Sequence, residues 1–200
     1  TNLRDTLLLD VRNHPADLDF GSRQLSMAAE LLIDQDDFRE EANKHFKRLV
    51  LGKRVRLRGG LVIEADRCDK DADGEVTRVF ARCVTSVPGA DPEDGLKPKG
   101  VIHWVSADEA VPATIRCYDR LFGVPEPARE QDLMAAVNPH SLIVIETAMI
   151  EPELVNATPE QVFQFEREGY FVADRYDHRA DRPVFNMTIG LRDTWSSSHG

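Results

Sequence analysis

The sequence predicts a mainly β protein, and three features support that fold class. Short apolar segments alternate with polar residues at a period of two, most clearly in 183–191, PVFNMTIGL. Segment 59–84 is typical of a hairpin, with two alternating runs around a turn of sequence DADGE. The order of elements expected in 6–88 is echoed in 99–191. This echo predicts two similar β-barrels rather than one domain.

The first half of the chain begins with LLLDV at 7–11, which predicts a buried strand, followed by a turn at 13–17. Segment 22–34 is ambiguous, because strand alternation and helical spacing both fit parts of it. A short helix is expected at 36–46, because its acidic start and later basic residues suit the helix macrodipole.

In the second half, 86–99 is rich in Pro, Gly and Asp and is expected to form an exposed loop. Strands are expected at 100–106 and 141–150, and 111–127 predicts a strand followed by a turn. A short helix is expected at 130–137, EQDLMAAV.

Segment 163–174, FQFEREGYFVAD, predicts an aromatic-rich strand in which Gly169 marks a bend or a close approach. Gln164, Glu166 and Arg167 are polar residues placed among these aromatics. Gln and Arg side chains hydrogen-bond to base edges, and aromatic rings stack on bases. The alternative is a half-buried strand with an ordinary solvated face.

The composition is that of a folded globular protein, with 42% hydrophobic and 30% charged residues among 200. No apolar run approaches the roughly 20 residues that span a bilayer. Three cysteines without CxxC spacing favour a reducing, cytoplasmic setting. The chain starts without Met and nearly inside a strand, so we expect a fragment of a longer protein.

Basic residues are segregated, although the net charge is −10. Segment 44–58 holds seven Lys or Arg residues and no acid. Within it Arg54, Arg56 and Arg58 alternate with apolar residues, so a strand would present a row of arginines on one face. Such a row is either a solvated edge or a surface that contacts phosphates and bases.

Motifs for catalysis and metal binding are missing. There is no P-loop, GxSxG, HExxH or Rossmann fingerprint, so no catalytic residue is predicted. Asp69, Asp71, Asp73 and Gly74 imitate half of an EF-hand loop, but its twelfth position is Phe80 instead of Glu. We therefore predict no metal site and no cofactor in this chain.

Several long blocks occur in the order of a known family: DFREEANKHFKRLVLGKRVRLR, KGVIHWVSA, IRCYDRLF, FQFEREGYFVAD and, near the end, GLRDTW. Together they resemble the C-terminal anticodon-binding region of bacterial glutaminyl-tRNA synthetase, a class I enzyme. The resemblance implies two six-stranded-type, ribosomal-protein-L25-like β-barrels with exchanged strands and a few short helices. We expect one barrel at 1–98, the other at 99–195, and a flexible tail at 196–200.

The resemblance also implies which residues bind tRNA. It places Arg56 at the first anticodon base, and Arg48 with Lys47 at the third, while Lys44 belongs to the same basic segment. Gln164 and Arg167, with Glu166 close by, fall at the central uridine. Two departures stand out. Ala16 replaces an asparagine-like contact, and an arginine that helps hold the central base would precede residue 1.

In the family, a catalytic Rossmann domain uses ATP and Mg²⁺ and lies upstream of this region. The resemblance therefore implies a cytoplasmic, monomeric ligase whose partner is the tRNA for glutamine, with no membrane contact. This chain alone would bind the anticodon loop without catalysing a reaction. Two alternatives are the related region of an archaeal or eukaryotic-type glutamyl-tRNA synthetase and a stand-alone L25-like protein that binds structured RNA.

Overall fold

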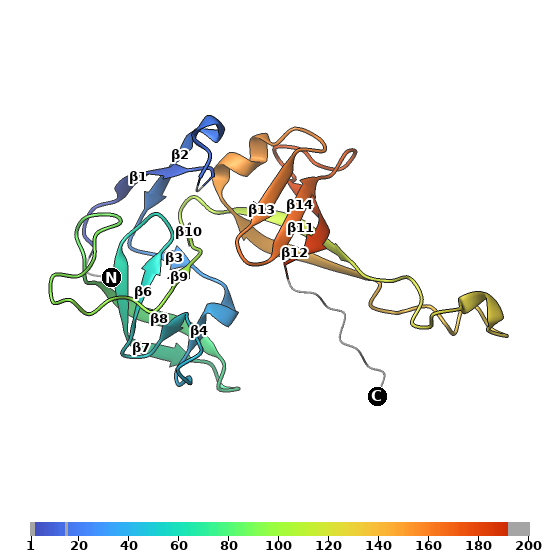
Figure 1. The fold of residues 1–200 in the computed structure, drawn as a ribbon, viewed down its shortest axis with the longest axis horizontal. Coiled ribbons are helices and arrows are strands. Elements are labelled where there is room, and N and C mark those ends of the chain that lie inside the picture. Colours follow the sequence, from blue (N-terminus) through green and yellow to red (C-terminus); the bar gives the residue numbers. More distant parts are fainter. Residues whose placement is uncertain (1–2, 15, 192–200) are drawn as a thin grey trace. The chain divides into compact units, whose positions relative to one another are not determined.

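The structure, a computed structural model, describes residues 3–14 and 16–191. It divides the chain into two compact units, Thr1–Ala110 and Val111–Gly200. Both units are built from strands and short 3-10 helices, which confirms the mainly β prediction (Figure 1). The tail predicted at 196–200 lies outside the described residues.

The described residues of unit 1, 3–14 and 16–110, form ten strands, most of them short. They are β1 Leu7–Arg12, β2 Ser22–Met27, β3 Leu31–Leu32, β4 Phe38–Arg39, β5 Leu49–Val50, β6 Arg54–Leu57, β7 Val62–Lys70, β8 Val76–Cys83, β9 Val101–Ile102 and β10 Val105–Ser106. The 3-10 helices η1 Leu18–Phe20 and η2 Gln35–Asp37 complete the unit. Its largest sheet has the order β8-β7-β6-β9, in which β6 pairs antiparallel with β7 and parallel with β9.

The core of unit 1 explains why β6 forms as the alternation predicts. Val55 and Leu57 are fully buried, whereas Arg54 and Arg56 point to the opposite, outer face. The buried pair packs in one cluster with Met27, Leu49 and other apolar side chains from neighbouring strands. The predicted hairpin is also present, as β7 and β8 around a turn at 71–75.

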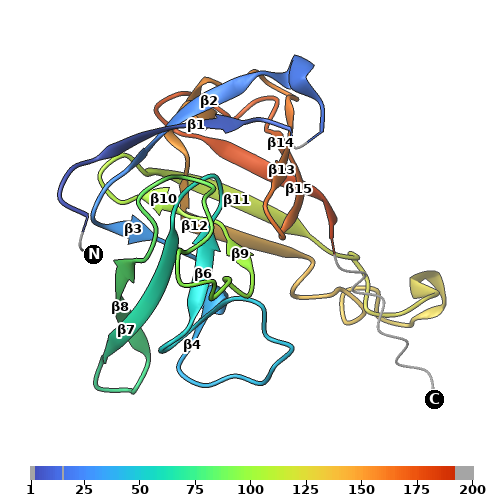
Figure 2. The same cartoon turned by 60° about the vertical axis from the view of Figure 1, so that its left-hand side comes forward.

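Unit 2 is organised around one five-stranded sheet of order β12-β11-β15-β14-β13. Its strands β11, β12, β13 and β14 are labelled in two views (Figure 1 and Figure 2). The strands are β11 Val111–Tyr118, β12 Leu142–Ile150, β13 Val162–Phe165, β14 Gly169–Ala173 and β15 Val184–Gly190, with 3-10 helices η3 Pro127–Arg129 and η4 Pro152–Asn156. Phe163, Phe165, Phe171 and Phe185 make ring contacts in its core. Segment 119–141 extends away from the sheet between β11 and β12 (Figure 1).

Both helices predicted from the sequence are wrong, because neither 36–46 nor 130–137 is α-helical. In the first, Phe38 and Arg39 form strand β4, which pairs with β5. In the second, the Asp132 carboxylate accepts hydrogen bonds from the amides of Met134 and Ala135, which builds turns instead.

The single strand predicted at 163–174 is a tight hairpin, β13 and β14. Within residues 3–14 and 16–191 the hydrogen-bonded strands form open sheets, and none of these sheets closes on itself. Strands β9 and β10 follow residue 98, yet they pair with β6 and β3 of unit 1. These two short pairings therefore join segments that lie far apart in the sequence.

Candidate nucleic-acid interface

The predicted tRNA-binding residues form one group in each unit. In unit 1, Lys44 and Lys47 lie exposed in the loop between β4 and β5. The Asn43 side chain accepts a hydrogen bond from the His45 amide, and the backbone carbonyl of Asn43 accepts one from the Phe46 amide. These bonds satisfy the backbone in a turn rather than in a helix.

Gly100 fixes the end of this loop. A Cβ atom at Gly100 would lie 1.8 Å from the carbonyl oxygen of Lys47, so only glycine permits this approach. The Gly100 carbonyl in turn accepts a hydrogen bond from the amide of Arg56, at 3.0 Å. The structure therefore brings the backbones of Lys47 and Arg56 to the two sides of one glycine.

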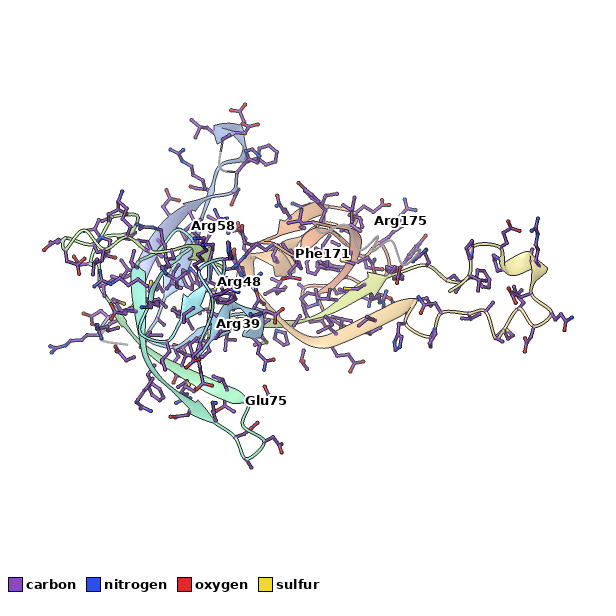
Figure 3. The ribbon with its side chains drawn as sticks, turned by 60° about the horizontal axis from the view of Figure 1, so that its bottom comes forward. Arg39, Arg48, Arg58, Glu75, Phe171 and Arg175 are labelled. Atoms are coloured by element: carbon purple, nitrogen blue, oxygen red, sulfur yellow. The ribbon has the colours of Figure 1, made fainter. Side chains whose placement is uncertain are left out.

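Arg48 is held by the short 3-10 helix η2. Its Nε lies 3.2 Å from the carboxylate of Asp37, and another guanidinium nitrogen donates to the carbonyl of Asp36 at 2.8 Å. The side chain of Asp37 is only 2% exposed, whereas that of Arg48 remains 19% exposed. Arg48 is labelled in Figure 3. Because Asp36 and Asp37 already hold the guanidinium in one orientation, it loses little conformational freedom when it forms a further hydrogen bond.

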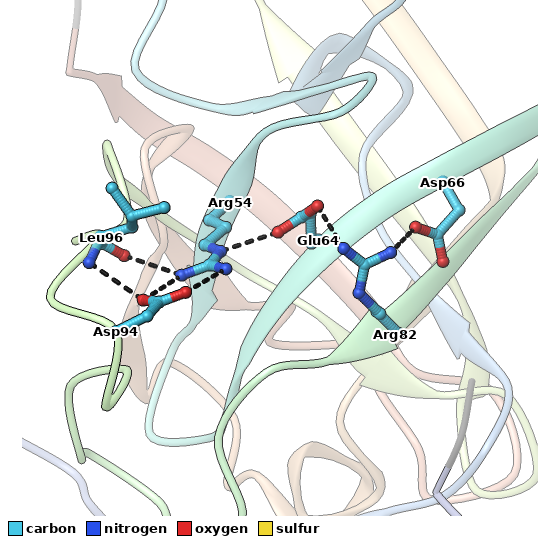
Figure 4. A network of polar contacts seen from close by, with 6 residues as sticks. All are labelled: Arg54, Glu64, Asp66, Arg82, Asp94 and Leu96. Carbon is cyan, nitrogen blue, oxygen red and sulfur yellow. Dashed lines mark hydrogen bonds and ion pairs between the residues drawn. The ribbon is translucent and has the colours of Figure 1, made fainter.

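Arg54, by contrast, is saturated by acids from its own unit. Both its terminal nitrogens donate to Asp94 at 2.7 Å, and its Nε donates to Glu64 at 2.7 Å (Figure 4). The hydrogen bonds from Arg54 lower the pKa of the Asp94 carboxyl from 3.8 to about 2. Asp94, followed by Glu64, raises the pKa of the Arg54 guanidinium. Little of this side chain is left to contact RNA.

Arg56 is engaged more loosely by the same loop, 86–99. Its guanidinium donates to the Ala90 carbonyl at 2.9 Å and to Asp91 at 2.8 Å. Arg56 is 17% exposed and Asp91 is 54% exposed, so this ion pair faces solvent on one side. The basic segment 44–58 contains no acid, but the fold supplies acids from more than 30 residues away.

In unit 2, Gln164 is exposed on β13, directly opposite Tyr170 of β14. The next polar residues, Glu166 and Arg167, lie in the turn that joins the two strands, and both are half-buried and already engaged in interactions. The carbonyl of Phe165 accepts a hydrogen bond from the amide of Glu168 at 3.0 Å, which closes the turn.

Arg167 has a left-handed backbone, with φ of 65°. Left-handed backbone costs a residue with a Cβ roughly 1–2 kcal/mol and is concentrated at functional sites. Gly169, next in the hairpin, is closely approached as predicted, because a Cβ there would lie 2.4 Å from the Ile189 carbonyl oxygen. This close approach anchors the turn to β15.

The predicted turn at 13–17 is built around His14, whose Nδ1 accepts hydrogen bonds from the amides of Ala16 and Asp17. Ala16 is exposed, and its methyl group has no polar atom to offer a ligand. The loss of a contact at this position stays a prediction.

Metal ligation and thiol chemistry each require a particular arrangement of side chains. Among the residues that the structure describes, no three His, Cys, Asp or Glu side chains gather where they could hold a metal ion. Burial raises the pKa of the thiols of Cys68, Cys83 and Cys117, which disfavours the reactive thiolate. No helix in residues 3–14 and 16–191 is long and apolar enough to cross a membrane.

The chain is similar to proteins of known family over most of its length. Two families described as "tRNA synthetases class I (E and Q), anti-codon binding domain" match residues 1–84 and 101–174. A glutamine–tRNA ligase of Yersinia enterocolitica is 54% identical over 189 residues, which are 94% of this chain and 34% of that protein. One of Photobacterium profundum is 52% identical over 192 residues, which are 96% and 34%.

These matches cover both units, and the order of the two families follows the order of the units. The chain spans about a third of the length of the curated relatives that it matches. The chain is built of two units of strands, each with a group of exposed or outward-facing Arg, Lys or Gln side chains. It belongs to the anticodon-binding domains of the class I (E and Q) tRNA synthetases.

Proposed function

We propose that this chain is the anticodon-recognition region of a glutamine–tRNA ligase, an enzyme that attaches glutamine to its tRNA with ATP. The observation that carries the proposal is the identity of 52–54% to glutamine–tRNA ligases across 94–96% of the chain. The same observation disfavours a glutamyl-tRNA synthetase and a stand-alone RNA-binding barrel, the two alternatives from the sequence.

In this function, unpaired bases of the anticodon loop are read on their edges by amide and guanidinium groups. Arg56 reads the first base, and Arg48 with Lys47 reads the third, while Lys44 adds to the positive field. Gln164 and Arg167, assisted by Glu166, read the central base. The fixed guanidinium of Arg48 supports its role, because a hydrogen bond to the Asp36 carbonyl and an ion pair with Asp37 already orient it.

Arg56 needs one further step in this proposal. Its present partners, Ala90 and Asp91, occupy the donors that a base would use. Since Asp91 is exposed, water can replace Arg56 as its partner at low cost when a base arrives. Loop 86–99 therefore holds the Arg56 guanidinium through these two hydrogen bonds until RNA binds.

The remaining parts of the enzyme are also proposals. ATP and Mg²⁺ belong to a catalytic domain outside this chain, which agrees with the missing nucleotide-binding motifs and with the one-third coverage of the relatives. The chain itself would bind no cofactor. The partners are the tRNA for glutamine and the catalytic domain of the same polypeptide, in a cytoplasmic monomer.

Three substitutions in the full-length protein test the proposal. Arg56→Ala and Gln164→Ala should each narrow the gap in affinity between the tRNA for glutamine and the same tRNA with an altered anticodon. The loss of a bidentate base contact costs about 1–3 kcal/mol, or roughly a 5- to 150-fold change. Lys53→Ala is the matched control, because Lys53 is exposed beside β6 and should contribute only to general attraction.

The control should weaken binding to both RNAs equally and reduce the salt dependence. If all three variants lose affinity equally for both RNAs, the basic surface attracts RNA without reading bases, and the assigned roles are wrong.

A further inference from the structure

Arg39 and Phe46 form a contact that none of the predicted roles uses. The central guanidinium carbon of Arg39 lies 4.7 Å from the centroid of the Phe46 ring, and that of Arg48 lies 5.9 Å from it. Two guanidinium groups therefore share one aromatic ring, and Figure 3 labels Arg39 and Arg48 in the same region of unit 1. Both distances fall within the range of cation–π attraction.

The two arginines differ in what else holds them. Arg48 is fixed by Asp37 and by the carbonyl of Asp36. Arg39 is exposed and forms no ion pair with any carboxylate of residues 3–14 and 16–191, although Glu40 follows it directly. Glu40 pairs with Lys70 instead. The Phe46 ring is thus the contact that positions the Arg39 guanidinium.

An exposed guanidinium that packs on an aromatic ring can take a further planar group on its other face. The guanidinium is planar, its charge is delocalised and it is weakly hydrated. Unpaired bases stack on guanidinium planes as they do on aromatic rings. A comparable pair in the same unit is already complete, because Arg67 lies 3.4 Å from the Phe80 ring centroid and also pairs with Asp69 at 2.8 Å. Arg39 retains a surface for a ligand, whereas Arg67 has a carboxylate partner.

We propose that Arg39, supported by Phe46, is the stacking surface for the unpaired RNA base whose edge Arg48 reads. The inference rests on the proposed function and adds two residues to it. One arginine, fixed by Asp37, supplies hydrogen-bond donors, and its neighbour on the same ring supplies a plane. Together they provide the edge contact and the face contact that recognition of a single-stranded base requires.

The decisive variant is Arg39→Lys in the full-length protein, because it keeps the charge and removes the plane. We expect it to weaken binding to the tRNA for glutamine by about 5- to 150-fold, the range for the loss of one stacked base. Phe46→Leu keeps an apolar side chain and should weaken binding by roughly 2- to 5-fold, through the lost cation–π support. Arg67→Lys is the matched control and should bind as the wild type does.

A tRNA that lacks the base at the third anticodon position separates stacking from contact with the RNA backbone. On that RNA, Arg39→Lys should bind as the wild type does, because there is no base left to stack. Wild-type affinity of Arg39→Lys for the intact tRNA would overturn the inference. An equal loss on both RNAs would also overturn it, since Arg39 would then contact the backbone. If the wild type itself does not distinguish tRNAs with different anticodons, the proposed function fails instead.

Discussion

Replacement of Gly100 by Ala should damage the loop of unit 1 that carries the proposed tRNA-binding residues Lys47 and Arg48, through a single steric clash. The new Cβ would lie 1.8 Å from the carbonyl oxygen of Lys47 and 2.7 Å from its carbonyl carbon, far inside any tolerated contact. Both atoms belong to the backbone, so no side-chain rotation can relieve the clash. Either the loop that carries Lys47 and Arg48 moves away, or β9 moves and strains the hydrogen bond between Gly100 and Arg56.

Forced overpacking of this kind costs about 1–3 kcal/mol of unfolding free energy, and sometimes more. For a protein of this size, each kcal/mol lowers Tm by roughly 2–4 °C. We expect Gly100→Ala to melt at a correspondingly lower temperature. We also expect it to bind the tRNA for glutamine more weakly, because the guanidinium of Arg48, proposed to read a base, is displaced. Thermal denaturation followed by circular dichroism and a binding titration measure the two effects.

Gly123→Ala is the matched control for this experiment. The nearest atom that its Cβ would meet is the Ala136 carbonyl oxygen at 3.9 Å, an ordinary contact, and its φ is not left-handed. We expect unchanged stability or a gain of about 0.4–1 kcal/mol from the stiffer unfolded chain. If Gly100→Ala melts and binds like Gly123→Ala, the close approach of Lys47 to Gly100 does not exist, and the geometry of the loop is wrong.

Three further predictions concern acid stability, the strained turn and salt. The folded-state pKa of Asp94 is depressed from 3.8 to about 2, so its pair with Arg54 stabilises the fold above about pH 4 and is lost between about pH 4 and 2. In urea unfolding, Asp94→Asn should make the free energy of unfolding depend less on pH in that window. A pH dependence equal to that of the wild type would show that the Asp94–Arg54 ion pair does not stabilise the fold. Arg167→Gly should leave the melting temperature unchanged or slightly higher, because relief of the left-handed backbone strain offsets the larger conformational entropy that glycine loses on folding. The same variant should bind tRNA more weakly, and an affinity equal to that of the wild type would show that Arg167 is not part of the interface. Lys44→Ala and Lys47→Ala should each reduce the slope of log Kobs against log salt by about 0.7–0.9, and an unchanged slope would place both lysines away from the phosphates.

Strand alternation was predictable where the signal is local. Residues 53–58 show a period of two, and the structure buries Val55 and Leu57 as that pattern requires. Segment 59–84 carries its turn within its own sequence, so the hairpin follows from short-range information.

The two helix predictions were wrong because tertiary contacts and solvent exposure determine the conformation of those segments. In 36–46, Asp37 is buried to hold Arg48, and Phe38 pairs with Leu49, which a helix would prevent. In 130–137, Met134 is 76% exposed, so a helix would gain no packing, and so short a helix is not stable alone. Neither the partner strand nor the exposure is visible in the local sequence pattern.

The choice of side chains for the candidate site stays a prediction, but the structure shows that several of them already have partners. Residue types and their order point to Arg56 and Gln164, because guanidinium and amide groups suit base edges. The sequence does not reveal that loop 86–99 folds back on β6, because its acids lie about 35–40 residues from Arg54 and Arg56. The Asp-rich composition of that loop was the available signal, and it indicates only an exposed loop.

The central claim is that this chain distinguishes anticodons, and one titration tests it most directly. The full-length protein is titrated at physiological salt with the tRNA for glutamine, and then with the same tRNA carrying one altered anticodon base. Since each base contact is worth about 1–3 kcal/mol, the unaltered tRNA should bind at least roughly 5-fold more tightly. Equal affinity for the two RNAs would show that the protein does not read the anticodon, and it would contradict the account.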